Sequence, residues 1–209
     1  MSLAADLTWR YSLMKYGRTS GKKSPNISVS SCLKILKLKK ISKLNLKVKL
    51  VVGFIYQDEA VFIRAKEKLK QRFGRVDFES AQLDFDYTEY YAAEMGLKLK
   101  RRFVSFARLV PISDLYRIKL YTNRMEKRLV APSGGRQINI DPGYIDLAKL
   151  VLATTKDYAH RIFLRKGIFA EITLSFKGDS FCPNEWTYPD YRTKEYIDIF
   201  NQIRKLYHP

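Results

Sequence analysis

The residue best suited to proton transfer in this chain is His160, which lies in a stretch from Asn139 to Glu171 where polar side chains interrupt apolar segments. Asp157 precedes this histidine closely in the sequence, and Glu171 lies further along the same stretch. A carboxylate beside an imidazole orients the ring for general acid–base work. We therefore predict His160, Asp157 and Glu171 as catalytic residues.

Four further residues of the same stretch are predicted to bind a ligand. Lys156 and Arg161 supply positive charge, and a guanidinium group holds a phosphate or carboxylate through two parallel hydrogen bonds. Asp141 and Tyr144 belong to the segment N-I-D-P-G-Y, which can face the same cleft if the hairpin carrying His160 folds over the strand before it. The matching ligand is a small phosphorylated or anionic compound, such as a nucleotide.

Each of these residues also has a purely structural interpretation. Asp141-Pro142-Gly143 is a typical turn sequence, so the aspartate can serve only to shape a turn. His160 can be a half-buried strand residue with its hydrogen bonds satisfied. Lys156 and Asp157 can form a hairpin ion pair of little energetic consequence. The prediction of a ligand site therefore depends on the residues acting together.

Several classes of chemistry lack the residues they need. The chain has two His and two Cys, which do not provide a zinc site with several imidazoles or a disulfide scaffold. The segment 17–24 has three residues between its glycines where a phosphate-binding loop has four. The segment T-K-D at 155–157 lacks the residue that separates Lys and Asp in the guanine-reading element of small GTPases. We assign no metal ligand and leave the cofactor and the existence of catalysis open.

The positive charge is concentrated at the start of the chain. Of the 209 residues 39 are Lys or Arg and 21 are Asp or Glu, which gives a net charge of +18, and Asp6 is the one acid among residues 1–50. We interpret residues 1–46 as a basic, poorly ordered arm and 47–209 as a single α+β domain. The arm is either a nucleic-acid-binding or lipid-binding segment or a solvated extension. No long uncharged apolar run and no leader sequence are found, so we expect a cytoplasmic protein without a membrane span, of open oligomeric state.

Hydrophobic periodicity predicts a strand at 48–56 and a helix from Asp58 to Gly74. Further elements follow in the order strand, strand, helix and strand, which matches the ferredoxin-like βαββαβ core. The segment 147–155 is apolar and ambiguous between helix and strand. We expect a C-terminal β-hairpin and an amphipathic helix to be added to the core; the predicted ranges of these later elements are 76–80, 82–87, 102–110, 114–129, 137–140, 159–164, 168–176 and 196–206.

Several segments resemble the bacterial family called domain of unknown function 4416. They are L-V-V-G-F-I at 50–55, D-F-D-Y-T-E-Y-Y at 84–91, E-M-G at 94–96, K-R-R-F-V-S-F at 100–106, I-K-L-Y-T-N at 118–123, N-I-D-P-G-Y at 139–144, T-K-D-Y-A-H-R-I at 155–162 and W-T-Y-P-D-Y at 186–191. The resemblance extends from about residue 47 to the C-terminus. It implies no established activity, and the label "GTP-binding protein" that some members carry finds no support in the incomplete motifs above.

Two functions remain open from the sequence. The first is a domain that binds a small phosphorylated or anionic ligand, with or without acting on it. The second is a nucleic-acid or protein interaction module without chemistry, which would use the basic arm and exposed aromatic residues. We favour a core role for the aromatic segments at 85–91 and 186–191.

Overall fold

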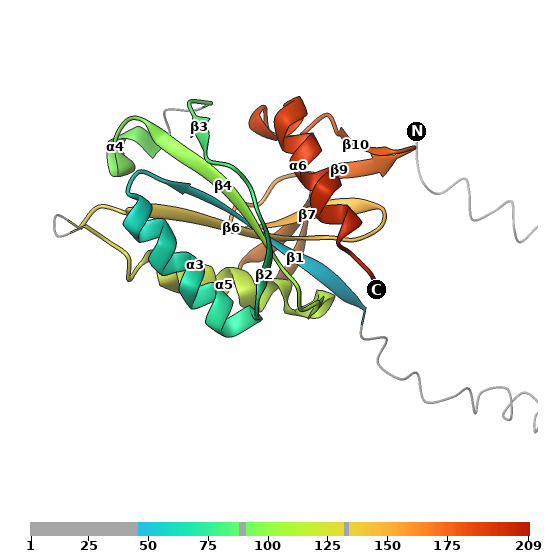
Figure 1. Cartoon of the computed structure of the whole chain (residues 1–209), viewed down its shortest axis with the longest axis horizontal. Coiled ribbons are helices and arrows are strands. Elements are labelled where there is room, and N and C mark those ends of the chain that lie inside the picture. Colours follow the sequence, from blue (N-terminus) through green and yellow to red (C-terminus); the bar gives the residue numbers. More distant parts are fainter. Residues whose placement is uncertain (1–45, 88–90, 132–133) are drawn as a thin grey trace, which may run out of the picture. The chain divides into compact units, whose positions relative to one another are not determined.

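A computed structural model describes residues 46–209, apart from 88–90 and 132–133 (Figure 1). The predicted basic arm therefore lies, except for Leu46, outside the described residues. The strands are β1 (Lys47–Tyr56), β2 (Val76–Glu79), β3 (Leu83–Phe85), β4 (Leu99–Phe106), β5 (Val110–Pro111), β6 (Ile138–Ile145), β7 (Lys149–Thr154), β8 (Arg161–Arg165), β9 (Ile168–Lys177) and β10 (Ser180–Pro183). The α-helices are α3 (Glu59–Phe73), α4 (Ala92–Met95), α5 (Leu115–Glu126) and α6 (Lys194–Lys205).

The strands of the described part join in one antiparallel sheet of ten strands. Its main path runs in the order β10-β9-β7-β6-β1-β4-β2, while β3 pairs with β4, β5 with β1 and β8 with β9. The helices α3 and α5 lie on one face of this sheet, and α6 lies on the other (Figure 1). No helix among the described residues is long and apolar enough to cross a membrane.

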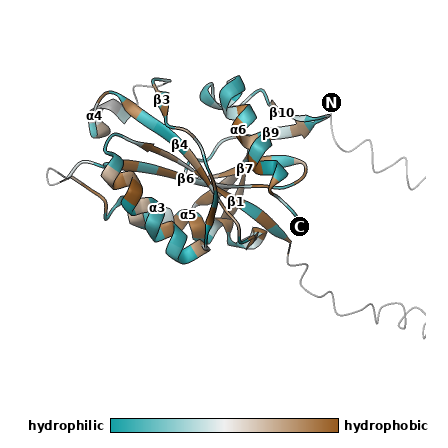
Figure 2. Ribbon diagram, in the orientation of Figure 1, coloured by the Kyte–Doolittle hydropathy of each residue, from teal (hydrophilic) through white to brown (hydrophobic). Residues whose placement is uncertain are grey.

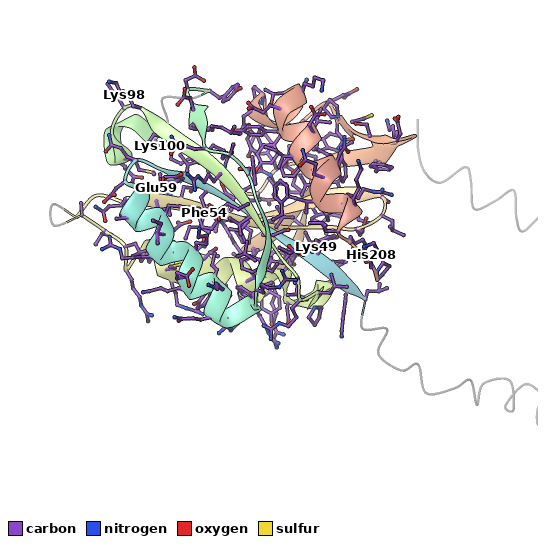
Figure 3. All side chains as sticks on the ribbon, viewed as in Figure 1. Lys49, Phe54, Glu59, Lys98, Lys100 and His208 are labelled. Atoms are coloured by element: carbon purple, nitrogen blue, oxygen red, sulfur yellow. The ribbon has the colours of Figure 1, made fainter. Side chains whose placement is uncertain are left out.

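The central strand β1 is hydrophobic along most of its length (Figure 2). It is buried from Val48 to Tyr56 because it pairs with β4 on one side and β6 on the other and is covered on both faces. Phe54 lies between β1 and α3, where its ring meets the edge of Phe62 with centroids 5.2 Å apart (Figure 3). The predicted strand at 48–56 is confirmed.

The two long helices of the first half follow from ordinary helix signals. Asp58 caps α3 by accepting a hydrogen bond of 2.8 Å from the backbone N–H of Ala60. Gly74 ends the helix with a φ of 96°, a conformation that favours glycine. The predicted apolar stripes of both helices are buried against the sheet; in α5 and its C-terminal turn they comprise Leu115, Ile118, Thr122, Met125 and Leu129. Both helix predictions are confirmed.

The prediction of a ferredoxin-like core is wrong. The ambiguous segment 147–155 contains the strand β7, which pairs with β6 on one side and β9 on the other. The strands of the second half therefore belong to the same large sheet as those of the first half, in a mostly β domain. They do not form a separate hairpin added to a four-stranded core. A short apolar run does not distinguish strand from helix by periodicity, which is why the sequence did not show the extent of the sheet.

The prediction that Asp141-Pro142-Gly143 forms a turn is also wrong, because β6 continues through these residues to Ile145. The backbone N–H of Ile140 points away from β1, since it donates to a side chain of α5. In an antiparallel strand the direction alternates, so Pro142, two residues later, also points away from β1 and deprives it of no hydrogen bond. Gly143 is needed for close approach, because a Cβ there would lie 2.4 Å from the carbonyl oxygen of Val151.

The predicted C-terminal elements are present. β8 and β9 form a hairpin whose loop residues Lys166 and Gly167 have φ values of 53° and 72°, as a tight two-residue turn of this kind requires. In α6 the side chains of Tyr196, Phe200 and Ile203 are buried against the sheet.

Candidate functional site

The sheet divides between β6 and β7. In the described chain the two strands pair from Gly143 to Ile145 on β6, opposite Leu150 to Leu152 on β7. Before Gly143, β6 runs along β1, while β7 continues along β9 as far as Thr154. We call this divergence, between Ile138–Pro142 of β6 and Ala153–Thr154 of β7, the strand fork. Most of the residues predicted from the sequence lie around it.

Two side chains of α5 take the place of the missing strand at the edge of β6. The backbone N–H of Ile140 donates to Glu126 Oε1 at 2.7 Å, and its carbonyl oxygen accepts from Lys119 Nζ at 3.0 Å. These contacts satisfy backbone groups that would otherwise be buried without partners. The strand fork is thus a built feature of the fold, held apart by charged residues.

Asp141, one of the predicted ligand residues, is occupied by protein partners. Its Oδ1 lies 3.1 Å from Lys119 Nζ, and its Oδ2 accepts a hydrogen bond of 2.6 Å from Asn139. Asp141 stands opposite Gly53 in β1, alternates with Ile140 along β6, and so faces away from α5. The ion pair with Lys119 therefore passes through the sheet at the fork.

Glu126 is a candidate acid–base group that the sequence did not reveal. Burial raises the pKa of its carboxyl group to about 7; Lys119 lowers it, and the charge of Asp141 raises it further. Its second oxygen lies 3.9 Å from Arg136, whose guanidinium also pairs with Glu94 at 2.7 Å. The feature of the sequence that could have revealed Glu126 is its position directly after Met125, at the border of the buried stripe of α5.

On the β9 side of the fork, Glu171 brings predicted residues together. Its side chain is 2 % exposed, and Oε2 lies 3.2 Å from His160 Nε2 and 2.8 Å from Arg161 Nε. Thr173 donates to the other carboxylate oxygen at 3.5 Å. A carboxylate held in this way fixes the orientation of the imidazole ring.

Arg161 is held by three protein partners. Besides the bond to Glu171, its Nη1 donates to the carbonyl oxygen of Lys156 at 3.1 Å, and its Nη2 donates to the Tyr188 hydroxyl at 2.5 Å. Its side chain is 5 % exposed. Arg161 therefore positions Glu171 and the loop at Lys156, and little of its guanidinium group is left for the predicted binding of an anion.

Aromatic rings surround His160. The Trp186 ring stacks on the imidazole with centroids 5.4 Å apart and an interplanar angle of 10°, and Tyr158 lies 5.7 Å away. Trp186 and Tyr188 are 41 % and 43 % exposed, so the core role favoured for this segment does not describe them. Burial raises the pKa of Tyr188, and the negative charge of Asp141 adds to the rise, which places both sides of the fork within electrostatic reach of each other.

Two of the predicted residues do not join this group. Asp157 is exposed and makes no hydrogen bond or ion pair with another described side chain. Tyr144 is buried in the apolar cluster under α3 and α5, on the face opposite Asp141, and this burial raises its pKa to about 12. His160, Glu171, Lys156 and Arg161 lie together at one corner of the fork, with Asp141 across it.

A buried ion pair underlies the fork. Arg101 Nη2 donates to Asp190 at 2.6 Å, and Arg101 Nε donates to the Tyr196 hydroxyl at 3.3 Å. The other terminal nitrogen of Arg101 and the hydroxyl of Tyr191 are buried without a hydrogen-bond partner in the described structure. No local sequence pattern indicates this pair, because its residues lie in β4 and in the loop before α6.

The donor set around the fork does not suit a metal ion. Within the described residues there is no cluster of three or more His, Cys, Asp or Glu side chains placed to hold one. The carboxylates instead lie against Arg, Lys and His side chains. The groups of this arrangement that could exchange protons with a ligand are the imidazole of His160 and the carboxyl group of Glu126.

Comparison with known proteins gives a family. The model of the family described as domain of unknown function (DUF4416) matches residues 46–207, which is more than half of the chain. The comparisons with curated proteins and with solved structures gave no match.

Proposed function

We propose that this chain, which belongs to the DUF4416 family, binds a small anionic ligand at the corner of the strand fork and exchanges a proton with it through His160. The residues that would meet the ligand are His160, Lys156, Trp186 and Tyr188. Glu171 and Arg161 would act as positioning residues beneath them. The family description names no activity, so the proposal is based on the geometry of this corner.

The observation that carries the proposal is the way in which His160 is held. A buried carboxylate accepts from Nε2, and the indole of Trp186 lies flat against the ring. With the Nε2 proton directed at Glu171, the neutral ring carries its acceptor lone pair on Nδ1. No described residue bonds to Nδ1, so this nitrogen is available to a ligand.

The charge at the corner depends on this histidine. With a neutral imidazole, Lys156 and Arg161 exceed Glu171 by one positive charge, and a proton on Nδ1 of His160 would add a second, which favours an anion. Transfer of that proton to the bound ligand would leave Nδ1 as an acceptor again.

The test is thermal unfolding of the full chain with nucleotides, sugar phosphates and small carboxylates. A ligand present at about 100 times its dissociation constant stabilises the folded state by roughly 2.7 kcal/mol. We expect the stabilisation to be lost in His160→Gln and kept in His208→Gln, an equal change at the other histidine of the chain.

Two results would contradict the proposal. One is a panel in which no ligand stabilises the protein. The other is a stabilising ligand that acts equally on the wild type and on His160→Gln, since the imidazole would then have no part in binding.

A further inference from the structure

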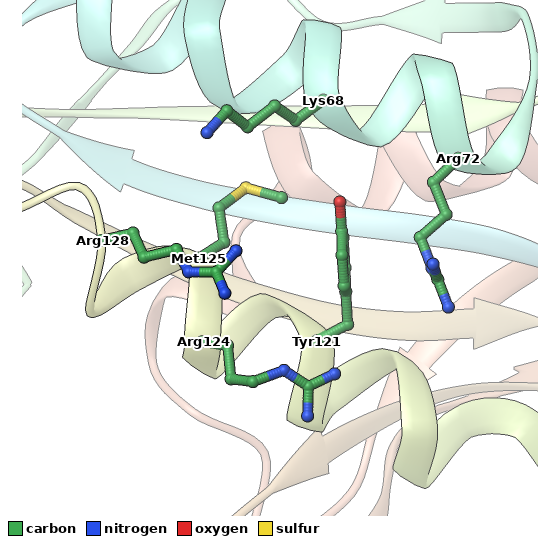
Figure 4. A pocket seen from close by; sticks show the side chains of 6 residues that line it. All are labelled: Lys68, Arg72, Tyr121, Arg124, Met125 and Arg128. Carbon is green, nitrogen blue, oxygen red and sulfur yellow. The ribbon is translucent and has the colours of Figure 1, made fainter.

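A second group of charged residues lies between α3 and α5. It differs from the strand fork in composition, because it contains cations and no carboxylate. A hollow of about 290 Å³ lies there, and Figure 4 shows the side chains that line it reaching in from both helices. The lining residues are Lys68, Arg72, Tyr121, Arg124, Met125 and Arg128. We call this hollow the basic groove.

The four cations of the basic groove have no acidic partner among the described side chains, and all four are exposed. Their neighbours on the same helices differ in this respect. Lys66 and Lys70 of α3 pair with Glu79 and Glu67, and Arg117 and Lys119 of α5 pair with Asp114 and Asp141. Cations without an ion pair also occur elsewhere, as at Arg64 of α3, but the groove gathers four of them at one place.

Gathering like charges costs free energy, which the helices offset only in part. Arg72 and Arg124 lie in the last turns of α3 and α5, where the helix dipole favours positive charge. Lys68 lies earlier in α3, where the helix dipole does not stabilise its charge. An anionic ligand seated between the two helices would remove the remaining repulsion.

An aromatic ring gives the groove a defined shape. The guanidinium carbon of Arg72 lies 4.5 Å from the centroid of the Tyr121 ring, so the ring holds this arginine at one end of the hollow. Met125 is buried at its floor. Arg72 and Arg124 can each present a planar fork of donors, the geometry that matches phosphate oxygens.

We propose that the basic groove binds a small ligand that carries two or more phosphate groups. Four cations, carried by α3, by α5 and by the turn after α5, exceed what one phosphate needs, and they match a chain of two or three. A hollow of about 290 Å³ is at the lower end of small-molecule sites, so it suits the phosphates themselves better than a long polymer. The site is separate from the strand fork and does not depend on the function proposed there.

The test is calorimetric titration of the full chain with inorganic triphosphate, with pyrophosphate and orthophosphate as further arms. The variant Arg72→Gln with Arg124→Gln removes two groove charges and keeps most of each side-chain stem. Its matched control is Lys177→Gln with Lys205→Gln, which removes two exposed charges elsewhere. We expect the groove variant to weaken triphosphate binding by about tenfold or more and the control to leave it nearly unchanged.

Three outcomes would overturn the proposal. The first is that triphosphate does not bind the wild type at all. The second is that both variants weaken binding equally, which would show an effect of net charge alone. The third is that a single-stranded oligonucleotide binds in a groove-dependent way while triphosphate does not, which would assign the groove to a polymer. Thermal unfolding of each variant without ligand shows whether it is folded.

Discussion

The strand fork and the basic groove both concentrate charged side chains, but they treat charge in opposite ways. At the fork, Glu171 lies against Arg161, Asp141 against Lys119 and Asp190 against Arg101. In the groove, cations from α3 and α5 face one another across Tyr121 without a carboxylate. Buried charges need partners because desolvation is costly, whereas exposed charges can be left unpaired. The contacts of the fork therefore fix its side chains in position, whereas the exposed cations of the groove are the groups that the proposed anion site would use.

The largest effect should come from breaking a charge pair at the fork. Glu171→Ala leaves the guanidinium of Arg161 buried without its carboxylate, so we expect a loss of about 3–5 kcal/mol in the free energy of unfolding. Urea unfolding measures this. Glu171→Gln keeps a hydrogen-bond acceptor and should lose less. If Glu171→Ala unfolds at the same urea concentration as the wild type, the ion pairs at the fork are not needed for stability.

The second effect concerns the raised pKa of Glu126. The pKa of Glu126 is about 7 in the folded state and 4.5 ordinarily. Between pH 4.5 and pH 7 the folded state therefore holds a proton that the unfolded state has lost. Stability is therefore fully present below about pH 4.5 and falls as the pH rises to about 7. At pH 8 Glu126→Gln should be more stable than the wild type, on the order of 3 kcal/mol.

The control for Glu126 is Glu94→Gln, which removes another carboxylate partner of Arg136 but lies at an exposed position. Its unfolding free energy should follow the same pH profile as the wild type. If Glu126→Gln keeps the wild-type slope between pH 5 and pH 7, the carboxyl group is not the source of the pH dependence.

A third effect would test the point where the fork begins. Gly143→Ala places a methyl group against the backbone of Val151 and should destabilise the fold by about 1–3 kcal/mol, as overpacking does. In Gly53→Ala the nearest atoms are side-chain atoms of Phe103 and Arg101, at 3.1 and 3.3 Å, so the loss should be smaller. If Gly143→Ala and Gly53→Ala unfold at the same urea concentration, β6 and β7 move apart to accommodate the added methyl group without cost.

The smallest effect is expected in the groove. Arg72→Gln with Arg124→Gln removes repulsion between exposed charges, so the unfolding free energy should stay within about 0.5 kcal/mol of the wild type. Any gain should be largest at low salt, since salt screens the repulsion. A strong loss of stability would show that these arginines hold the helices in place.

Local patterns in the sequence predicted the elements whose signals are contained in a short segment. The cap at Asp58 and the terminal Gly74 defined α3, and the turn at Lys166-Gly167 defined the hairpin. His160, Arg161 and Glu171 could be grouped because that hairpin brings them together across two paired strands. These parts of the fold and site follow from chain neighbours.

The rest depended on contacts between distant segments. Nothing in the spacing of Arg101 and Asp190 indicates that they pair across the core, and nothing near Trp186 indicates that it stacks on His160. Pro142 was misread because the role of a proline depends on which way its nitrogen points, and that is set by β1. Such facts become available only when the sheet is assembled.

The contacts of Ile140 have a consequence for hydrogen exchange. Its amide proton is held by the carboxylate of Glu126, whereas amides elsewhere in a ladder are held by a neighbouring strand. Protection of this one amide therefore reports on whether α5 is docked, and its exchange rate would measure the opening of the helix separately from the opening of the sheet.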